Sequence, residues 1–78
     1  LDFLMENKIK KIIQKTISEE INFKKDIDLI QSGFLDSFSV LVLIANLEKE
    51  FKIKISLKNF DIKSISTIKQ IVKLIKKN

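Results

Sequence analysis

A single glycine, Gly33, and the absence of proline constrain the fold of this 78-residue chain more than any other feature. Glycine and proline are the residues that most often interrupt helices and form tight turns. The chain also contains no cysteine and no histidine, which removes disulfides, thiolate metal sites and the commonest general base. We therefore expect a small all-α domain, and not a self-sufficient hydrolase or metalloenzyme.

Apolar residues recur at three- and four-residue spacing in three stretches, as on the buried face of a helix. These stretches cover residues 5–17, 40–51 and 68–75. Ser66 and Thr67 precede the third stretch as candidate caps, and a glutamine three residues after Thr67 fits a capping box. The pattern predicts a bundle of three long helices and one short helix.

The connections between these helices differ in length. Residues 19–36 have no sustained period, and we expect their apolar side chains to hold this long connection against the helices. Residues 53–56 alternate like a strand but are too short for a sheet, so we expect an extended link followed by a short turn over residues 57–60. We expect one domain over residues 1–78, with residues 1–4 as a frayed extension.

The positive charge is concentrated at one end of the chain. Residues 51–78 contain eight lysines and one aspartate, whereas residues 21–50 contain three lysines and five acidic residues. Because arginine, tyrosine and tryptophan are absent, nucleic-acid binding is not favoured. No apolar run approaches the roughly 20 residues of a membrane span, and no signal peptide pattern opens the chain. We expect a cytoplasmic protein without a membrane span.

The stretch Gly33-Phe34-Leu35-Asp36-Ser37-Phe38 leads from the long connection into the second helix. A serine at this position is commonly a helix cap. Three features favour a modified serine: a carboxylate able to hold a divalent metal, a glycine that permits the turn, and a helix dipole that favours phosphate. Since the motif contains no histidine or lysine to activate Ser37, another enzyme must modify it.

This stretch resembles the attachment motif of acyl carrier and peptidyl carrier proteins, in which the serine of an Asp-Ser pair bears a 4′-phosphopantetheine arm. The resemblance extends over nearly the whole chain and includes segments before and after the motif. The segments similar to the family are Ile9–Ile13 in the first helix, Asp28-Leu29 in the loop, Leu47-Glu48 and Phe51 in the second helix, and Ile65–Ile68 before the last helix.

The resemblance implies that Ser37 accepts 4′-phosphopantetheine from coenzyme A through a phosphopantetheinyl transferase that uses magnesium. It further implies that Asp36 positions the metal during the transfer. The thiol of the arm would then hold an acyl or aminoacyl group as a thioester. The implied partners also include an AMP-forming acyl or aminoacyl ligase and a downstream acyl-transfer or condensing enzyme. The chain itself would be a non-catalytic monomer.

The second helix differs from that of fatty-acid carriers, which displays acidic residues to basic partners. The positions expected to face outward here are Ser39, Val42, Asn46 and Lys49. This weakly charged face is more similar to peptidyl carriers, or to stand-alone carriers such as the D-alanyl carrier of teichoic acid modification. We expect Phe38, Leu41 and Val42 to form a partner-docking patch, and the alternative is that one or two of them belong to the core.

Two other functions remain open on the sequence alone. The chain is either a carrier or one of two alternatives: an unmodified carrier-like module for protein interactions, or a basic helical binder of nucleic acid or membrane surfaces. A gain in mass after incubation with coenzyme A, magnesium and a transferase distinguishes the carrier from both.

Overall fold

The structure is a computed structural model that describes residues 2–24 and 26–78. Its elements are α1 (Asp2–Thr16), α2 (Ser37–Phe51), the 3₁₀ helix η1 (Ile62–Ile65) and α3 (Ile68–Lys77). These residues form no strand. The predicted all-α class, with three long helices and one short one, is confirmed.

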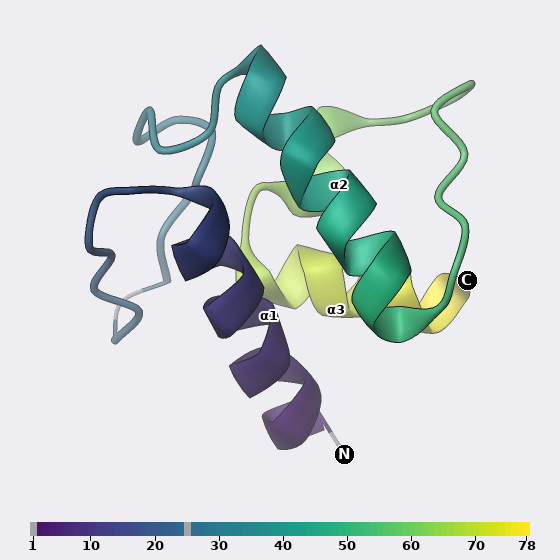
Figure 1. Cartoon of the computed structure of the whole chain (residues 1–78), viewed down its shortest axis with the longest axis horizontal. Coiled ribbons are helices and arrows are strands. Elements are labelled where there is room, and N and C mark those ends of the chain that lie inside the picture. Colours follow the sequence, from purple (N-terminus) through teal and green to yellow (C-terminus); the bar gives the residue numbers. More distant parts are fainter. Residues whose placement is uncertain (1, 25) are drawn as a thin grey trace.

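α1 packs against both α2 and α3, and η1 packs against the start of α3. Figure 1 shows α1 and α2 running in opposite directions, with α3 lying across them. The core between the helices consists entirely of aliphatic side chains, and no buried polar side chain occurs in the described part of the chain. The members buried most completely are Ile9, Ile13, Leu29, Leu43, Leu47, Ile65 and Ile71.

The first helix begins earlier than the sequence predicted. Residues 2–4 belong to α1, so they are helical and not the frayed extension that we expected; Leu1 lies outside the described residues. An ion pair of 2.6 Å between Lys76 Nζ and Asp2 Oδ1 holds this first turn against the end of α3. A charge contact between the two ends was not visible in the periodicity of either helix.

The short helix lies later than expected. Residues 57–60 form only a turn, in which the Phe60 N–H approaches the Leu57 carbonyl at 3.5 Å. The 3₁₀ helix starts after Asp61, whose Oδ1 accepts a hydrogen bond of 3.0 Å from the Lys63 N–H. Burial explains the shift, because Ile65 is fully buried whereas Leu57 is 54% exposed.

The end of α2 is anchored to the link that follows it. Glu48 Oε2 accepts a hydrogen bond of 2.8 Å from the Ile55 N–H, which ties the extended link to the helix. Lys52 adopts the left-handed conformation (φ 54°, ψ 47°), and its N–H bonds to the Glu48 carbonyl. This conformation ends the helix as glycine commonly does in other proteins.

The long connection between α1 and α2 is held against the helices, as predicted. Its residues Ile21, Leu29 and Leu35 are buried in the core. Gln14 on α1 fixes the start of the connection, because its Nε2 donates to the Glu19 carbonyl (2.7 Å) and its Oε1 accepts from the Ile21 N–H (3.1 Å). Further along, the Leu29 N–H donates to the Ser66 carbonyl at 2.6 Å. The connection therefore reaches α2 along a defined path.

Candidate functional site

The chain enters α2 through a turn that requires glycine. Gly33 has a φ of +84°, a region that side chains disfavour, and its N–H donates to the Ile30 carbonyl at 3.1 Å. Two residues later, Leu35 is buried in the core and its N–H donates to the Leu29 carbonyl at 3.0 Å. The turn and this anchor fix the direction in which Asp36 and Ser37 leave the core.

Asp36, and not Ser37, caps α2. Its backbone is extended (φ −110°, ψ −176°), and its Oδ1 accepts hydrogen bonds from the N–H and the hydroxyl of Ser39 at 2.8 and 2.9 Å. In return, the Asp36 N–H donates to Ser39 Oγ at 2.8 Å. The two residues thus satisfy each other's polar groups, as in a capping box. The alternative that Ser37 is merely the cap is wrong.

These hydrogen bonds keep the Asp36 carboxylate charged. The backbone N–H of Ser39, followed by its hydroxyl, lowers the pKa of Asp36 below its usual value, because both groups bond to the ionised form. The side-chain hydrogen bonds of Asp36 go to Oδ1, and the residue is exposed. Oδ2 therefore faces solvent beside Ser37 as an available anionic ligand.

Ser37 occupies the first helical position of α2 and is exposed. Within residues 2–24 and 26–78, its hydroxyl takes part in none of the hydrogen bonds that cap the helix. No acidic residue lies within the first turn of α2 itself, and the charged Asp36 carboxylate already bonds one N–H at the positive end of the helix dipole. The site therefore combines an exposed hydroxyl and one fixed carboxylate at the start of a helix.

The predicted docking residues lie on the outside of α2 beyond Ser37. Phe38 is 75% exposed and Leu41 is 55% exposed, whereas Val42 is half-buried. None of the three belongs to the hydrophobic core cluster, so the alternative that some of them are core residues is wrong. The first two are among the most exposed large apolar side chains in the described part of the chain.

Two residues expected to face outward have other contacts. Ser39 belongs to the capping box, and Asn46 lies beside α1, where its Nδ2 donates to Thr16 Oγ1 at 3.4 Å. The sequence alone did not identify the role of Ser39, because the usual capping box has a hydroxyl residue at the N-cap and an acidic residue three positions later. Here the order is reversed, and the only signal was the three-residue spacing from Asp36.

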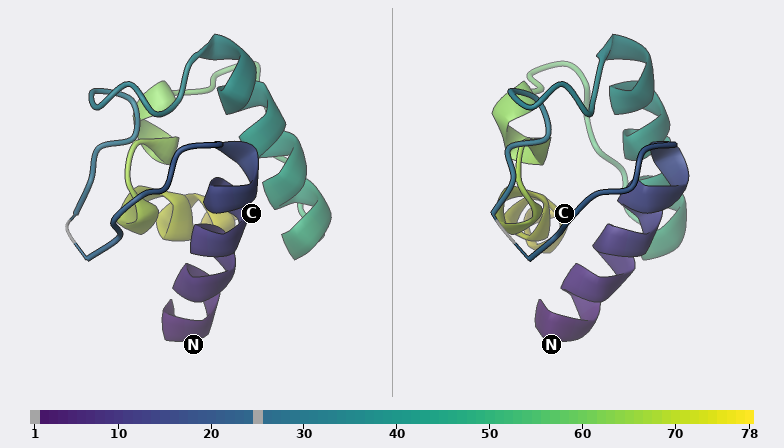
Figure 2. Two further views of the ribbon diagram at one scale, coloured as in Figure 1. Left: turned by 60° about the vertical axis from the view of Figure 1, so that its left-hand side comes forward. Right: turned by 90° about the vertical axis from the view of Figure 1, so that its left-hand side faces the viewer.

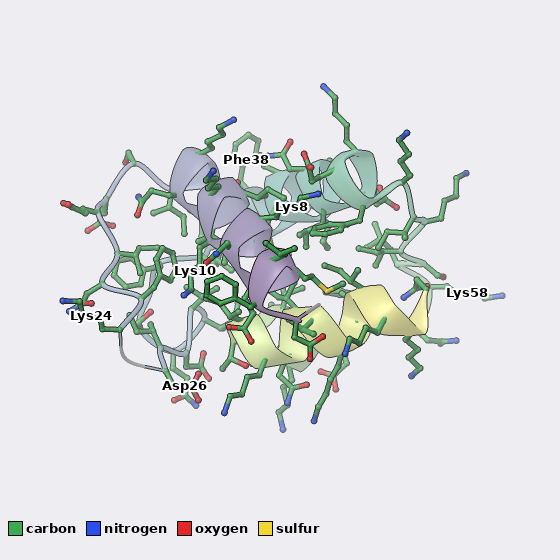
Figure 3. The ribbon with its side chains drawn as sticks, turned by 90° about the horizontal axis from the view of Figure 1, so that it is seen from below. Lys8, Lys10, Lys24, Asp26, Phe38 and Lys58 are labelled. Atoms are coloured by element: carbon green, nitrogen blue, oxygen red, sulfur yellow. The ribbon has the colours of Figure 1, made fainter. Side chains whose placement is uncertain are left out.

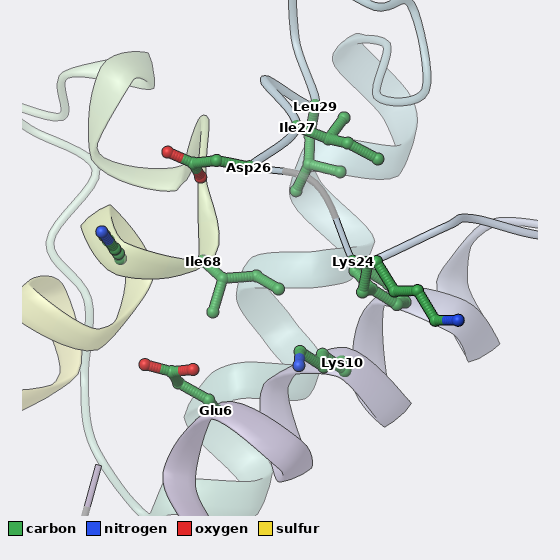
Figure 4. Close-up of a pocket in the computed structure, with 9 residues that line it drawn as sticks. Glu6, Lys10, Lys24, Asp26, Ile27, Leu29 and Ile68 are labelled. Atoms are coloured by element: carbon green, nitrogen blue, oxygen red, sulfur yellow. The ribbon is translucent and has the colours of Figure 1, made fainter. Parts of the chain in front are cut away.

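One pocket of the described structure lies away from this site. Figure 4 shows it between α1, residues 23–24 and 26–29, and the start of α3, with a volume of about 170 Å³ and a lining that comes from these segments. Ile27 and Ile68 are among its apolar lining, and Glu6 and Lys10 stand at its side on α1. The pocket is therefore separate from Ser37.

The described part of the chain contains no group of three acidic, histidine or cysteine side chains placed to hold a metal ion. A divalent cation such as Mg²⁺ requires several oxygen ligands, and Asp36 supplies only one carboxylate at this site. Any metal beside Ser37 must therefore obtain its remaining ligands from a partner or a substrate. No helix in residues 2–24 and 26–78 is long and apolar enough to cross a membrane.

Comparison with known proteins shows the family of the chain. Residues 7–75 match the family model described as the phosphopantetheine attachment site. The chain belongs to this family. It is therefore a carrier of the 4′-phosphopantetheine prosthetic group, and it is modified by other enzymes and does not itself catalyse a reaction.

Among individual proteins, the carrier is similar to three that are named D-alanyl carrier protein. It is 33% identical over 72 residues to the one from Streptococcus uberis, which covers 92% of this chain and 91% of the relative. It is also 33% identical over 64 residues to the Streptococcus suis protein (82% and 81% coverage) and 32% identical over 57 residues to the Leuconostoc citreum protein (73% of each). The predicted likeness to stand-alone carriers of the D-alanyl type is confirmed.

Proposed function

We propose that Ser37 is the attachment residue and that the carrier holds an aminoacyl group, with D-alanine as the favoured cargo. The observation that supports this most directly is the exposed Ser37 hydroxyl, left free because Asp36 and Ser39 cap α2. Ser37 also lies within the matched residues 7–75. The cargo is inferred from relatives named D-alanyl carrier protein, one of which is covered to 91% of its length.

In the proposed attachment, Ser37 Oγ forms a bond to the pantetheine-bearing phosphorus of coenzyme A. The pyrophosphate bond at that phosphorus breaks, and adenosine 3′,5′-bisphosphate leaves. The hydroxyl proton passes to a base of the transferase, since the carrier has no histidine and its motif has no lysine. Once attached, the group supplies a thiol that can hold an acyl group as a thioester, which a chain without cysteine cannot supply.

Asp36 is proposed to position a magnesium ion through Oδ2 during this transfer. Oδ1 is already occupied by Ser39, so a metal can bind the second oxygen without releasing the helix cap. The remaining ligands come from the transferase and from the pyrophosphate oxygens of coenzyme A, which are hard oxygen donors suited to Mg²⁺.

Phe38, Leu41 and Val42 are proposed to dock the enzymes that act on the arm. Contact there is apolar, because no acidic residue lies between Ser37 and Asn46 on α2. The proposed partners are a phosphopantetheinyl transferase, an AMP-forming ligase and a downstream acyl-transfer enzyme. A cytoplasmic location of a monomer is proposed, because coenzyme A and ATP are supplied there.

The attachment is tested by intact mass after incubation with coenzyme A, magnesium and a broad-specificity transferase. The wild-type chain is expected to gain the mass of one arm, and Ser37→Ala is expected to gain none. Ser56→Ala, which changes an exposed serine outside the motif, is expected to behave as the wild type. No gain in the wild-type chain with several transferases would overturn the proposal.

The docking patch is tested on the arm-bearing carrier with a D-alanine-activating ligase. Phe38→Asp, Leu41→Asp and Val42→Asp are each expected to slow loading, on the order of tenfold for a residue at the centre of an interface. Leu57→Asp places the same charge on an apolar side chain that is as exposed as Leu41 but lies outside α2, and serves as the control. Unchanged loading of Val42→Asp would remove that residue from the patch.

A further inference from the structure

The first turn of α1 exposes two neighbouring large apolar side chains. Phe3 is 72% exposed and Leu4 is 63% exposed. Figure 2 shows the start of α1 extending below the other helices in both views. Single exposed apolar residues are common on protein surfaces, but an adjacent pair at a projecting end resembles the apolar contacts of interfacial segments.

Lysines continue from this turn along the outer side of α1. Lys8 and Lys11 follow Leu4 by four and seven residues, so the three side chains share one face of the helix. Both lysines are exposed. Lys8 Nζ forms a loose ion pair of 3.9 Å with Glu50 Oε2, with both side chains in solvent.

A second row of lysines reaches the same turn from α3. Lys73, Lys76 and Lys77 are exposed near the end of this helix, and the 2.6 Å ion pair between Lys76 and Asp2 joins it to the first turn of α1. Figure 3, in which the start of α1 faces the viewer, shows nitrogen-tipped side chains projecting outward from α3. Asp2 is the only acidic residue of that first turn, and it is paired.

We propose that this end of the molecule binds the surface of a bilayer that contains anionic lipids. The basic apolar end, as we name it, consists of Phe3, Leu4, Lys8, Lys11, Lys73, Lys76 and Lys77. Each lysine near an anionic membrane surface strengthens binding by about fivefold, and the two apolar side chains can enter the headgroup region. Nucleic acid fits less well, because the chain has no arginine, tyrosine or tryptophan to read or stack on bases.

Binding at the basic apolar end would orient the carrier on the bilayer. This orientation is compatible with the carrier function, and the proposed membrane binding does not depend on that function. In Figures 1 and 2 the start of α2 lies at the opposite end of the molecule from the start of α1. A bilayer bound at the basic apolar end therefore leaves Ser37 directed away from the membrane. The site would stay accessible to other proteins while the carrier remains at the surface.

The experiment is co-flotation of the purified chain with vesicles of phosphatidylcholine alone or mixed with phosphatidylglycerol. We expect binding to the mixed vesicles only, with a loss of binding as salt increases. The triple variant Lys73→Gln, Lys76→Gln and Lys77→Gln is expected to lower the partition coefficient on the order of 100-fold. Phe3→Ser with Leu4→Ser is expected to weaken binding without removing its salt dependence.

The matched control is the triple variant Lys54→Gln, Lys58→Gln and Lys63→Gln, which removes the same charge from exposed lysines between α2 and α3. It is expected to change the partition coefficient by less than about fivefold, the effect of one lysine. Circular dichroism verifies that each variant is folded. The proposal is overturned if the chain does not bind mixed vesicles at low salt, or if both triple variants lower the partition coefficient equally. It is also overturned if the chain binds duplex DNA as tightly as the mixed vesicles and the variants weaken both kinds of binding equally.

Discussion

α2 and α3 begin with the same kind of cap. Asp36 and Thr67 both have extended backbones, and each side chain accepts a hydrogen bond from the N–H three residues later, at 2.8 Å from Ser39 and 3.1 Å from Gln70. Such a contact is worth about 1 kcal/mol at either helix. As supports for the fold, the two helix starts are therefore nearly equivalent.

They differ in the residue that comes next. After Thr67 the chain continues with Ile68, which packs against the hydrophobic core, whereas after Asp36 it continues with the exposed Ser37. At α3 the hydroxyl is itself the cap and is occupied. At α2 a carboxylate caps the helix, so the neighbouring hydroxyl is free for modification. The comparison shows that a serine hydroxyl at a helix start stays out of the cap when a different residue performs the capping.

The variant with the largest expected effect on the difference between the two helix starts is Asp36→Asn. Asparagine caps helices about as well as aspartate, so thermal unfolding is expected to change little, while the anionic ligand beside Ser37 is lost. We expect the rate of arm transfer to fall on the order of 10- to 100-fold, the range seen when a group that orients a metal site is removed. Transfer at the wild-type rate would show that the carboxylate acts only as a cap.

Gly33→Ala tests the turn that precedes Asp36, for which α3 has no counterpart, since Ser66 before Thr67 is in the ordinary helical region. An added Cβ would meet no atom within 4 Å, so the cost comes from the positive φ alone, about 1 to 2 kcal/mol of unfolding free energy. Urea denaturation measures it. Gly33→Asn is the control and should cost less, because asparagine tolerates this conformation better; equal stability of all three chains would contradict the argument.

A matched pair of cap variants separates effects on the free energy of unfolding from effects on the rate of arm transfer. Ser39→Ala and Thr67→Ala are each expected to lower the free energy of unfolding by about 0.5 to 1 kcal/mol. Only Ser39→Ala is expected to slow arm transfer, because it loosens Asp36 beside Ser37. The measurements are urea denaturation and the initial rate of mass gain. If both variants slowed transfer equally, the effect would reflect general destabilisation and not the position of Asp36.

The smallest expected effect concerns pH. The pKa of Asp36 is lowered in the folded chain by hydrogen bonds from Ser39, while in the unfolded chain it is about 3.9. A lowered folded pKa adds stability above the unfolded value, and this addition is lost as the pH falls through the folded value. Below about pH 4 the wild-type chain should therefore lose more stability than Asp36→Asn. Parallel unfolding curves of the two chains across this range would contradict the assignment.

The sequence predicted more of the fold than of the contacts between its parts. Helical spacing identified all three long helices, and the Asp36-Ser37 pair identified the family that the comparisons confirm. The sequence did not predict the position of the short helix or the hydrogen bond by which Glu48 anchors the link after α2. These errors share a cause: both features depend on which segment reaches the core after α2, and no local pattern specifies that.

What the sequence determined by itself was the helical class and the family, because spacing and a short motif are local properties of the chain. Only the tertiary structure decided that Phe38 and Leu41 lie outside the core and that the end of α3 meets the first turn of α1. Each of these depends on the direction in which a side chain points once the helices have packed. That direction is fixed by contacts between residues far apart in the sequence.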